Sequence, residues 1–440
     1  MKQRLRPRNG TGRSWRRLFT IATVAGVALA WIGLAIALFS RVGRWHAQDL
    51  TLYRSAASHV LDGQVPYRDF SLEYPPLALF PLTLPARLIG RGALPPRFAL
   101  AFLISNALWA AALALCTWLM ARRWLTPERT LTAVAMFVLV VFVGVPVFPW
   151  RFDFFPALLS ALALLLTMER RPATAGVCLA AGIATKLYPV VLAPVIVVWH
   201  LARGDRGGAL RFAGVTCIAT LGIFTPFWLA APAEFFSFLR YHELRGLQIE
   251  SVPAGLLMLG HALGLGQVGI VENFGALHLL SPASRAVMPF LFPTFVVGLS
   301  AVALLGFGRL RRERIVTGRP CDETLIGYAL ASVLIFMLTN KVLSPQFLIW
   351  LLPFVALLPG SQYGFALTAT ALTIVIFPFN YDGLIGLETP IVLLLNVRNL
   401  VLAGLTASVL WRLRPSAVRP PSDITAPVHL DLERRRTTRP

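Results

Sequence analysis

Apolar runs long enough to cross a lipid bilayer recur along almost the whole of this 440-residue chain. A helix needs about 20 mostly apolar residues to span the hydrocarbon core of a membrane. The chain is 56% hydrophobic and only 14% charged, so little sequence is left for a large soluble domain. We therefore predict an all-α fold, a polytopic membrane bundle of about twelve helices. The predicted spans are residues 18–40, 98–121, 129–148, 153–168, 172–184, 187–202, 212–231, 286–307, 324–340, 344–360, 362–379 and 390–411.

Basic residues stand in short clusters between these runs, as the positive-inside rule describes. Residues 1–17 carry seven cations and no acid, which predicts a cytoplasmic N-terminus before a membrane domain at 18–411. Residues 412–440 lack apolar periodicity and are predicted to form a disordered cytoplasmic tail. The net charge of +21 is thus explained by topology, and no nucleic-acid partner is expected. The clusters assigned to the cytoplasmic side are Arg122 and Arg123, Arg170 and Arg171, residues 203–211 and 309–319, and Arg412 with Arg414.

Two long connections, residues 41–97 and 232–285, are expected on the outer face of a cytoplasmic (inner) membrane. Within the first, the apolar segment 75–89 is short and begins with Pro75 and Pro76. Counting this segment as a span would move most later basic clusters to the outside. We therefore predict a helix that lies in the outer interface and covers a site at the membrane surface.

The cysteines do not have the paired spacing of a zinc or redox site. Nor does the sequence contain a Gly-rich phosphate loop, a nucleotide-binding fingerprint or an evident internal repeat. We interpret the cysteines as packing residues. They are Cys116, Cys178, Cys217 and Cys321.

Polar residues accumulate in the connections assigned to the outer face. Ionisable residues at membrane depth are costly, so each needs a partner or a function. The segment 240–251 places Arg, His, Glu, Arg, Gln and Glu within twelve residues, which is typical of a pocket that binds sugar hydroxyls and a phosphate. Other residues have plainer alternatives: Tyr67 as an interface anchor, and Asp49 as a helix N-cap.

Lysine is rare in this chain, which has only three lysines among 41 cations. Two of the three, Lys186 and Lys341, are predicted at the outer ends of helices. Because lysine supplies a compact charge with a tunable pKa, these two are candidates for holding a phosphate.

Four segments together carry a family resemblance. They are residues 63–76 (GQVPYRDFSLEYPP), 184–189 (ATKLYP), 245–251 (RGLQIES) and 340–347 (NKVLSPQF). The chain resembles, from about residue 18 to 411, the multi-pass bacterial polyprenyl-phosphate-mannose-dependent mannosyltransferases. The resemblance includes the phosphatidylinositol-mannoside mannosyltransferase branch.

This resemblance implies a glycosyltransferase C-type bundle with its active site at the outer face and a catalytic acid in the first outer loop. Asp49 stands where the family acid falls, and Tyr67, Asp69 and Glu73 are rivals close to it in sequence. Some related families use an Asp-Asp or Glu-x-Asp pair around a divalent metal. The first outer loop lacks such a pair, so we expect no obligatory metal or other cofactor.

The implied reaction is an inverting transfer in which Asp49 is the general base and the lipid phosphate is the leaving group. Cations beside that phosphate stabilise the charge that develops on it. The expected partners are a polyprenyl-phosphate-sugar donor, a glycolipid or glycan acceptor, and membrane lipids. The predicted donor phosphate ligands are Lys186, Arg240, Arg245 and Lys341. The predicted sugar or acceptor ligands are Tyr67, Asp69, Glu73, Asp153, His242, Gln248, Glu250 and Gln346.

Three alternatives remain open at this stage. The donor sugar could equally be arabinofuranose or glucose, since no residue distinguishes them. A transporter or flippase would also have about a dozen helices, although it would place its polar residues near the midplane and commonly repeat its halves. A non-catalytic scaffold for envelope assembly would tolerate replacement of Asp49.

Overall fold

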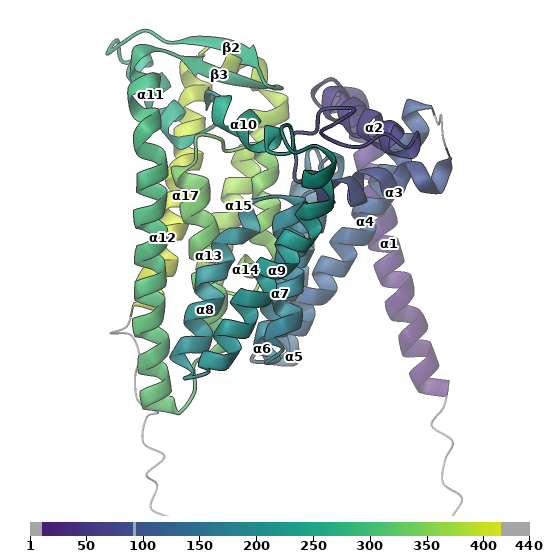
Figure 1. Ribbon diagram of the computed structural model, residues 1–440, viewed down its shortest axis with the longest axis vertical. Helices are drawn as coiled ribbons and strands as arrows, with labels where there is room; N and C mark the ends of the chain where they lie inside the picture. The colour runs from purple at the N-terminus through teal and green to yellow at the C-terminus, as the bar shows by residue number, and fades with distance from the viewer. Residues whose placement is uncertain (1–10, 91–93, 415–440) are drawn as a thin grey trace, which may run out of the picture.

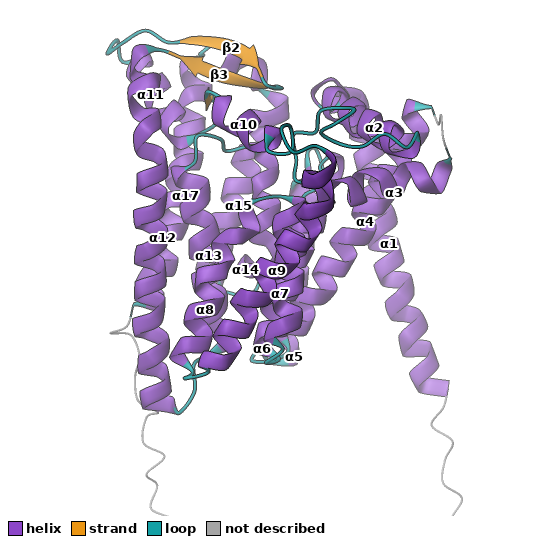
Figure 2. Ribbon diagram, in the orientation of Figure 1, coloured by secondary structure: helices purple, strands orange, loops and turns teal. Residues whose placement is uncertain are grey.

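The computed structural model describes residues 11–90 and 94–414, with side chains described from residue 25 onward. The described chain is mostly helical (Figures 1 and 2), and each predicted span contains a helix. Seven of the described helices are long and apolar enough to cross a membrane. The helices in the predicted spans are α1 (Thr11–Val42), α4 (Pro95–Ala121), α5 (Pro127–Val143), α6 (Phe154–Met168), α7 (Pro172–Thr185), α8 (Ala193–Ala202), α9 (Arg206–Ala230), α12 (Pro282–Thr317), α13 (Asp322–Thr339), α14 (Leu352–Val355), α15 (Gly360–Ile374) and α17 (Thr389–Leu413).

The polytopic helical bundle predicted from the apolar runs is thus confirmed, while the count of twelve spans stays a prediction. Several helices in the middle of the chain are shorter than a full span, among them α6 and α7. The long helix α13 lies largely inside the bundle, whereas α9 and α12 expose most of their surface. The predicted N-terminal segment and C-terminal tail fall mostly in residues 1–10 and 415–440, which lie outside the described residues.

The two long connections assigned to the outer face fold at one end of the bundle, the upper end in Figure 1. The first contains α2 (Ala47–Leu61) and α3 (Leu79–Ile89). Helix α3 occupies the segment predicted as a short helix and packs against α2 and α4. Its buried positions include Leu79, Leu82 and Ala86, spaced so that they share one helical face.

The second connection contains α10 (Ser237–Leu244), β1 (Leu247–Gln248), α11 (Val252–Ala262), β2 (Gly269–Asn273) and β3 (Ala276–Leu280). The strands form a small antiparallel sheet in the order β1-β3-β2. This sheet was not part of the sequence prediction. The Ser251 hydroxyl caps α11 by accepting a hydrogen bond from Ala254 N at 3.3 Å, which fixes the chain immediately after Glu250.

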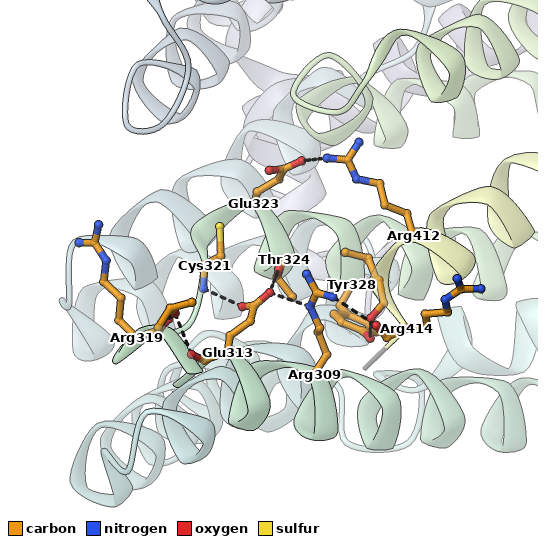
Figure 3. A network of polar contacts seen from close by, with 11 residues as sticks. Arg309, Glu313, Arg319, Cys321, Glu323, Thr324, Tyr328, Arg412 and Arg414 are labelled. Atoms are coloured by element: carbon orange, nitrogen blue, oxygen red, sulfur yellow. Dashed lines mark hydrogen bonds and ion pairs between the residues drawn. The ribbon is translucent and has the colours of Figure 1, made fainter. Parts of the chain in front are cut away.

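The opposite end of the bundle holds the basic connections and a polar network between helices α12, α13 and α17 (Figure 3). The Glu313 carboxylate is its centre and accepts hydrogen bonds from Arg309 Nε at 2.7 Å, Cys321 N at 2.8 Å and Thr324 Oγ1 at 2.7 Å. Nearby, Tyr328 Oη donates to the carbonyl of Leu413 at 2.7 Å. Helix α1 begins and α17 ends at this same end (Figure 1). The assignment of this end to the cytoplasm stays a prediction.

Candidate active site

Asp49 lies in the first turn of α2, where it forms an ion pair with Arg151. It is not the N-cap, because His46 occupies that position. His46 is buried, and its Nε2 donates to the carbonyl of Pro146 at 2.8 Å, which ties the start of α2 to the chain before Arg151. The Asp49 side chain is 30% exposed and that of Arg151 is 8% exposed. Asp49 is therefore held from one side and open to solvent on the other.

Arg151 follows the 3-10 turn Phe148–Trp150 and lies in the interior. Burial lowers the pKa of its guanidinium to about 10, and the nearby carboxylates of Asp153 and Glu250 oppose that shift. Arg151 is therefore a cation at neutral pH, and its charge favours the ionised form of the Asp49 carboxylate.

Lys186 is held by a buried carboxylate and surrounded by aromatic rings. Its Nζ donates to Asp153 Oδ1 at 2.7 Å, and Trp350 Nε1 donates to the same oxygen at 2.7 Å. Asp153 is 1% exposed, whereas Lys186 is 16% exposed. The ammonium lies 5.0 Å from the ring centroid of Phe152 and 5.4 Å from that of Trp350. Asp153 therefore positions Lys186, which presents the accessible charge.

Lys341 and Gln248 connect the second outer segment to the chain between α13 and α14. Lys341 Nζ donates to the carbonyls of Glu243 and Arg245, each at 2.8 Å. Gln248 Oε1 accepts from Leu343 N at 2.9 Å, and Gln248 N donates to the Lys341 carbonyl at 2.9 Å. These contacts fix the backbone that follows α10.

Glu250 is buried next to a second interior arginine. Arg398 Nη2, from α17, donates to the Glu250 carbonyl at 2.6 Å, and Tyr381 Oη lies 3.4 Å from the Glu250 carboxylate. Gln248 Nε2 lies 3.2 Å from the same carboxylate. Desolvation raises the pKa of Glu250 to about 7, against the charge of Arg398. Glu250 thus supports the site from within rather than facing solvent.

Lys186, Lys341 and Arg245 form a cationic region, and their charges act on His242 at the end of α10. Burial lowers the pKa of His242 to about 4, and the charges of Arg245, Lys186 and Lys341 add to the shift. His242 is therefore neutral at pH 7. Arg245 Nε is buried without a protein partner. Arg240, by contrast, lies on the exposed side of α10, and the structure gives it no ion pair among the described residues.

Other predicted ligands serve the first outer loop itself. Tyr67 is buried, and its hydroxyl donates to the Tyr74 carbonyl at 2.7 Å. This hydrogen bond joins two parts of the first outer loop. Asp69 accepts from Arg68 Nε at 2.9 Å and from Val65 N at 2.7 Å. The structure does not bring Tyr67 or Asp69 into contact with Asp49 or Lys186.

Of the two remaining predicted ligands, Gln346 lies in the 3-10 segment Pro345–Leu351 without a described polar contact to the network. Glu73 lines a cavity beside α2 and lies close to Tyr74 and to Tyr241 of α10, whose hydroxyl pKa values burial and the Glu73 carboxylate raise.

The sequence analysis assigned no role to four residues that contact the candidate site in the structure: Arg151, Trp350, Tyr381 and Arg398. Arg398 had a usable signal, since it is an isolated charge inside the apolar run 390–411. Trp350 and Tyr381 had none, because aromatic residues are common in membrane helices and only their contacts mark these two.

The fold and these contacts define a polytopic helical membrane protein with buried, paired charges gathered at one end of the bundle. Residues 72–339 match Glycosyltransferase family 87, and the chain belongs to this family. The matched region contains Glu73, Asp153, Lys186 and Glu250, whereas Asp49 precedes it. The protein is therefore a membrane glycosyltransferase.

Solved structures give more distant resemblances. ArnT from Cupriavidus metallidurans in the apo state is 14% identical over 90% of this chain and 77% of its own, with a TM-score of 0.48. The same protein bound to undecaprenyl phosphate gives 14% identity, 89% and 77% coverage, and a TM-score of 0.45. The Archaeoglobus fulgidus oligosaccharyltransferase gives 11% identity over 91% of this chain and 56% of its own, with a TM-score of 0.38. No curated protein gave a significant match.

Proposed function

We propose that this protein transfers mannose from polyprenyl-phosphate-mannose to a hydroxyl group of a glycolipid or glycan at the outer face of the cytoplasmic membrane. One observation carries the proposal. A partly exposed carboxylate, Asp49, and a partly exposed ammonium, Lys186, are each fixed by a buried partner of opposite charge at the same end of the bundle. A base and a phosphate ligand are the two charged groups that this reaction needs.

In the proposed reaction, Asp49 accepts the proton of the acceptor hydroxyl while that oxygen attacks the anomeric carbon. The bond from the anomeric carbon to the phosphate oxygen breaks, and the phosphate leaves with the electron pair on the opposite face of the sugar, which inverts the configuration. In this proposal the Lys186 ammonium stabilises the developing negative charge. Arg151 keeps Asp49 ionised and therefore able to accept the proton.

The geometry refines the roles proposed for the other cations and amides. Lys186 and Arg245 are the proposed phosphate ligands, with neutral His242 between them as a hydrogen-bonding group. Lys341 and Gln248 position the backbone of the second outer segment. No metal or other cofactor enters the proposed reaction.

A lipid-linked donor agrees with the surroundings of the site. The polar end is built on apolar helices, so a polyprenyl chain has membrane-facing surfaces beside it. The basic connections lie at the other end of the bundle, so the positive-inside rule supports an outer position for the polar end. Nucleotide sugars do not reach the outer face. Arabinofuranose and glucose remain alternative donor sugars. Membership of a glycosyltransferase family favours a transferase over a transporter.

The test compares the wild type with Asp49→Asn and the matched control Asp62→Asn, which changes an exposed carboxylate at the other end of α2. Each protein is purified in detergent and given radiolabelled polyprenyl-phosphate-mannose with a membrane lipid extract. We expect labelled glycolipid from the wild type and from Asp62→Asn, and none from a folded Asp49→Asn.

Transfer by Asp49→Asn would move the base to another carboxylate, with Glu73 as the next candidate. If the wild type does not transfer mannose, the mannose assignment is wrong. Arabinofuranose and glucose donors are then the next substrates to test, and failure with all of them would favour the transporter.

A further inference from the structure

A cavity of about 140 Å³ lies between α2 and the chain that leads into α3, and it is lined from Leu52 of α2 onward, outside the contacts of the proposed reaction. Besides four aliphatic side chains, its wall contains four polar side chains and two aromatic rings. They are Ser55, His59, Ser71, Glu73, Phe70 and Tyr74. The aromatic rings and hydrogen-bonding groups suit a sugar ring, which has apolar faces and a hydroxyl-bearing rim.

The helical repeat of α2 places this cavity in line with Asp49. Leu52, Ser55 and His59 line the cavity, and they follow Asp49 at intervals of three or four residues, which lie on one face of a helix. With a rise of about 1.5 Å per residue, Leu52 and Ser55 stand about 5 Å and 9 Å along the helix axis from Asp49. A sugar in the cavity would therefore adjoin a sugar whose hydroxyl faces Asp49.

The cavity also adjoins the cationic region through one shared ring. The Tyr74 ring, which lines the cavity, lies 4.9 Å from the Phe152 ring centroid at an interplanar angle of 81°. Lys186 Nζ lies 5.0 Å from the same centroid. Acceptor and donor ligands could thus occupy neighbouring spaces along a common aromatic wall.

Charge and polarity narrow the class of ligand. The Glu73 carboxylate repels a phosphate, so the cavity does not suit the donor head group. An apolar lipid chain would desolvate the Glu73 carboxylate and offer no partner to the free ring nitrogen of His59. Over residues 25–90 and 94–414, the described side chains include no group of three or more His, Cys, Asp or Glu residues placed to hold a metal ion. A neutral polyhydroxyl compound satisfies the wall best.

The volume sets the size of that ligand. One water molecule needs about 10–15 Å³ of such cavity volume, so about 140 Å³ leaves room for a ligand on the scale of one sugar ring. His59 is held for this role: its ring stacks on Phe70 at 4.9 Å, and its Nδ1 lies 2.5 Å from Gln64 Oε1. The other ring nitrogen, Nε2, remains for a ligand.

We infer that this cavity is an acceptor subsite for the sugar next to the one that receives mannose, so that acceptors with two or more sugars are preferred to a single sugar. The inference rests on the proposed function and specifies its acceptor. It assigns His59 and Ser55 to acceptor binding together with Glu73.

The test measures transfer from polyprenyl-phosphate-mannose to octyl α-mannoside and to octyl α-mannobioside by the full chain in detergent. We expect kcat/KM to be roughly tenfold or more higher for the mannobioside, the scale of one or two hydrogen bonds that include a charged group. His59→Ala and Glu73→Gln should bring the ratio of the two kcat/KM values close to one.

A second pair of variants fills space without removing a charge. Ser55→Phe places a ring in the cavity, whereas Ser58→Phe places the same ring on an exposed position of α2 that does not line it. We expect Ser55→Phe to abolish the preference for the longer acceptor and Ser58→Phe to keep it. The preference of the wild type is itself a test that needs no variant to fold.

The possible failures can be told apart. Equal use of both acceptors by the wild type, or an unchanged preference in the His59, Glu73 and Ser55 variants, would overturn the acceptor subsite while leaving mannose transfer established. Transfer to the lipid extract but to neither octyl glycoside would do the same. Absence of transfer to any acceptor would overturn the subsite together with the proposed function.

Discussion

The contact between Asp153 and Lys186 allows stability and catalysis to be separated in one set of variants. Asp153 is 1% exposed and accepts hydrogen bonds from Lys186 Nζ and Trp350 Nε1, both at 2.7 Å. Asp153→Asn leaves the Lys186 ammonium without its counterion in a largely buried position. Lys186→Met leaves the buried Asp153 carboxylate with only the indole as a partner. Each single variant therefore leaves one charge of the pair without its directly bonded partner.

The expected magnitudes follow from this burial. Removing one partner of a buried ion pair costs about 3–5 kcal/mol of unfolding free energy, whereas replacing both by neutral groups is often nearly neutral. The double variant Asp153→Asn/Lys186→Met should therefore recover most of the stability lost in either single variant. The coupling free energy between the two positions should be about 3 kcal/mol or more.

Activity should not follow stability in the double variant. Methionine cannot stabilise the leaving phosphate, so we expect transfer to stay lost when stability is recovered. Unfolding would be followed in detergent by denaturant titration, and transfer by the radiolabel assay. The exposed pair Arg68 and Asp69 gives a matched control, for which the coupling should be much weaker because solvent screens both charges. If the stability losses of the two single variants add up in the double variant, Asp153 and Lys186 do not form an energetically coupled buried pair. If the double variant still transfers mannose, Lys186 does not stabilise the leaving phosphate.

Two further predictions concern stability. The pKa of Glu250 is about 7 in the folded chain against an ordinary value of 4.5, so the folded state binds this proton more tightly than the unfolded state does. The free energy of unfolding should therefore fall by about 3 kcal/mol as pH rises from 4.5 to 7. Glu250→Gln should remove this slope, as melting curves in detergent at pH 5 and pH 8 would show; an unchanged slope would contradict the assignment. Glu313→Ala removes the acceptor of three hydrogen bonds at the opposite end of the bundle, which should lower the free energy of unfolding by about 3 kcal/mol. Transfer per folded molecule should change little. Loss of transfer in a stable protein would contradict a structural role for Glu313.

The helices could be predicted because their signal is local. An apolar run of sufficient length excludes other structures inside a bilayer, where every backbone group must bond within its own segment. The second outer connection lacks such a constraint. Strand β1 has two residues and pairs with β3, about 30 residues away, so neither length nor alternation indicates it. Helices α10 and α11 are likewise short, and each depends on packing against the chain around it.

The sequence singled out individual candidate side chains but not their contacts, and the roles of these side chains stay predictions. Asp49 and Lys186 were singled out as ionisable residues beside membrane spans, and the structure places both at the polar end. The contacts of the candidate site join residues that are remote in sequence: Arg151 follows its partner Asp49 by 102 residues, Trp350 and Asp153 are 197 residues apart, and Arg398 and Glu250 are 148 residues apart. A single sequence carries no information on such contacts. A single sequence does show a lone charge in an apolar run, and because such a charge is costly in a membrane, this signal would have identified Arg398.

Lys186 and Lys341 were chosen as phosphate candidates because lysine is rare in this chain. Their roles in the structure differ in the number of hydrogen-bond donors that each ammonium has left. A lysine ammonium has three donors and no acceptor. Lys341 uses two of them on the carbonyls of Glu243 and Arg245, so it mainly fixes the backbone after α10. Lys186 uses one on its counterion Asp153 and keeps two for a ligand, because the aromatic rings around it offer no strong hydrogen-bond acceptor. A phosphate oxygen is therefore better matched to Lys186, and Lys341 contributes by holding the backbone of Arg245 in place.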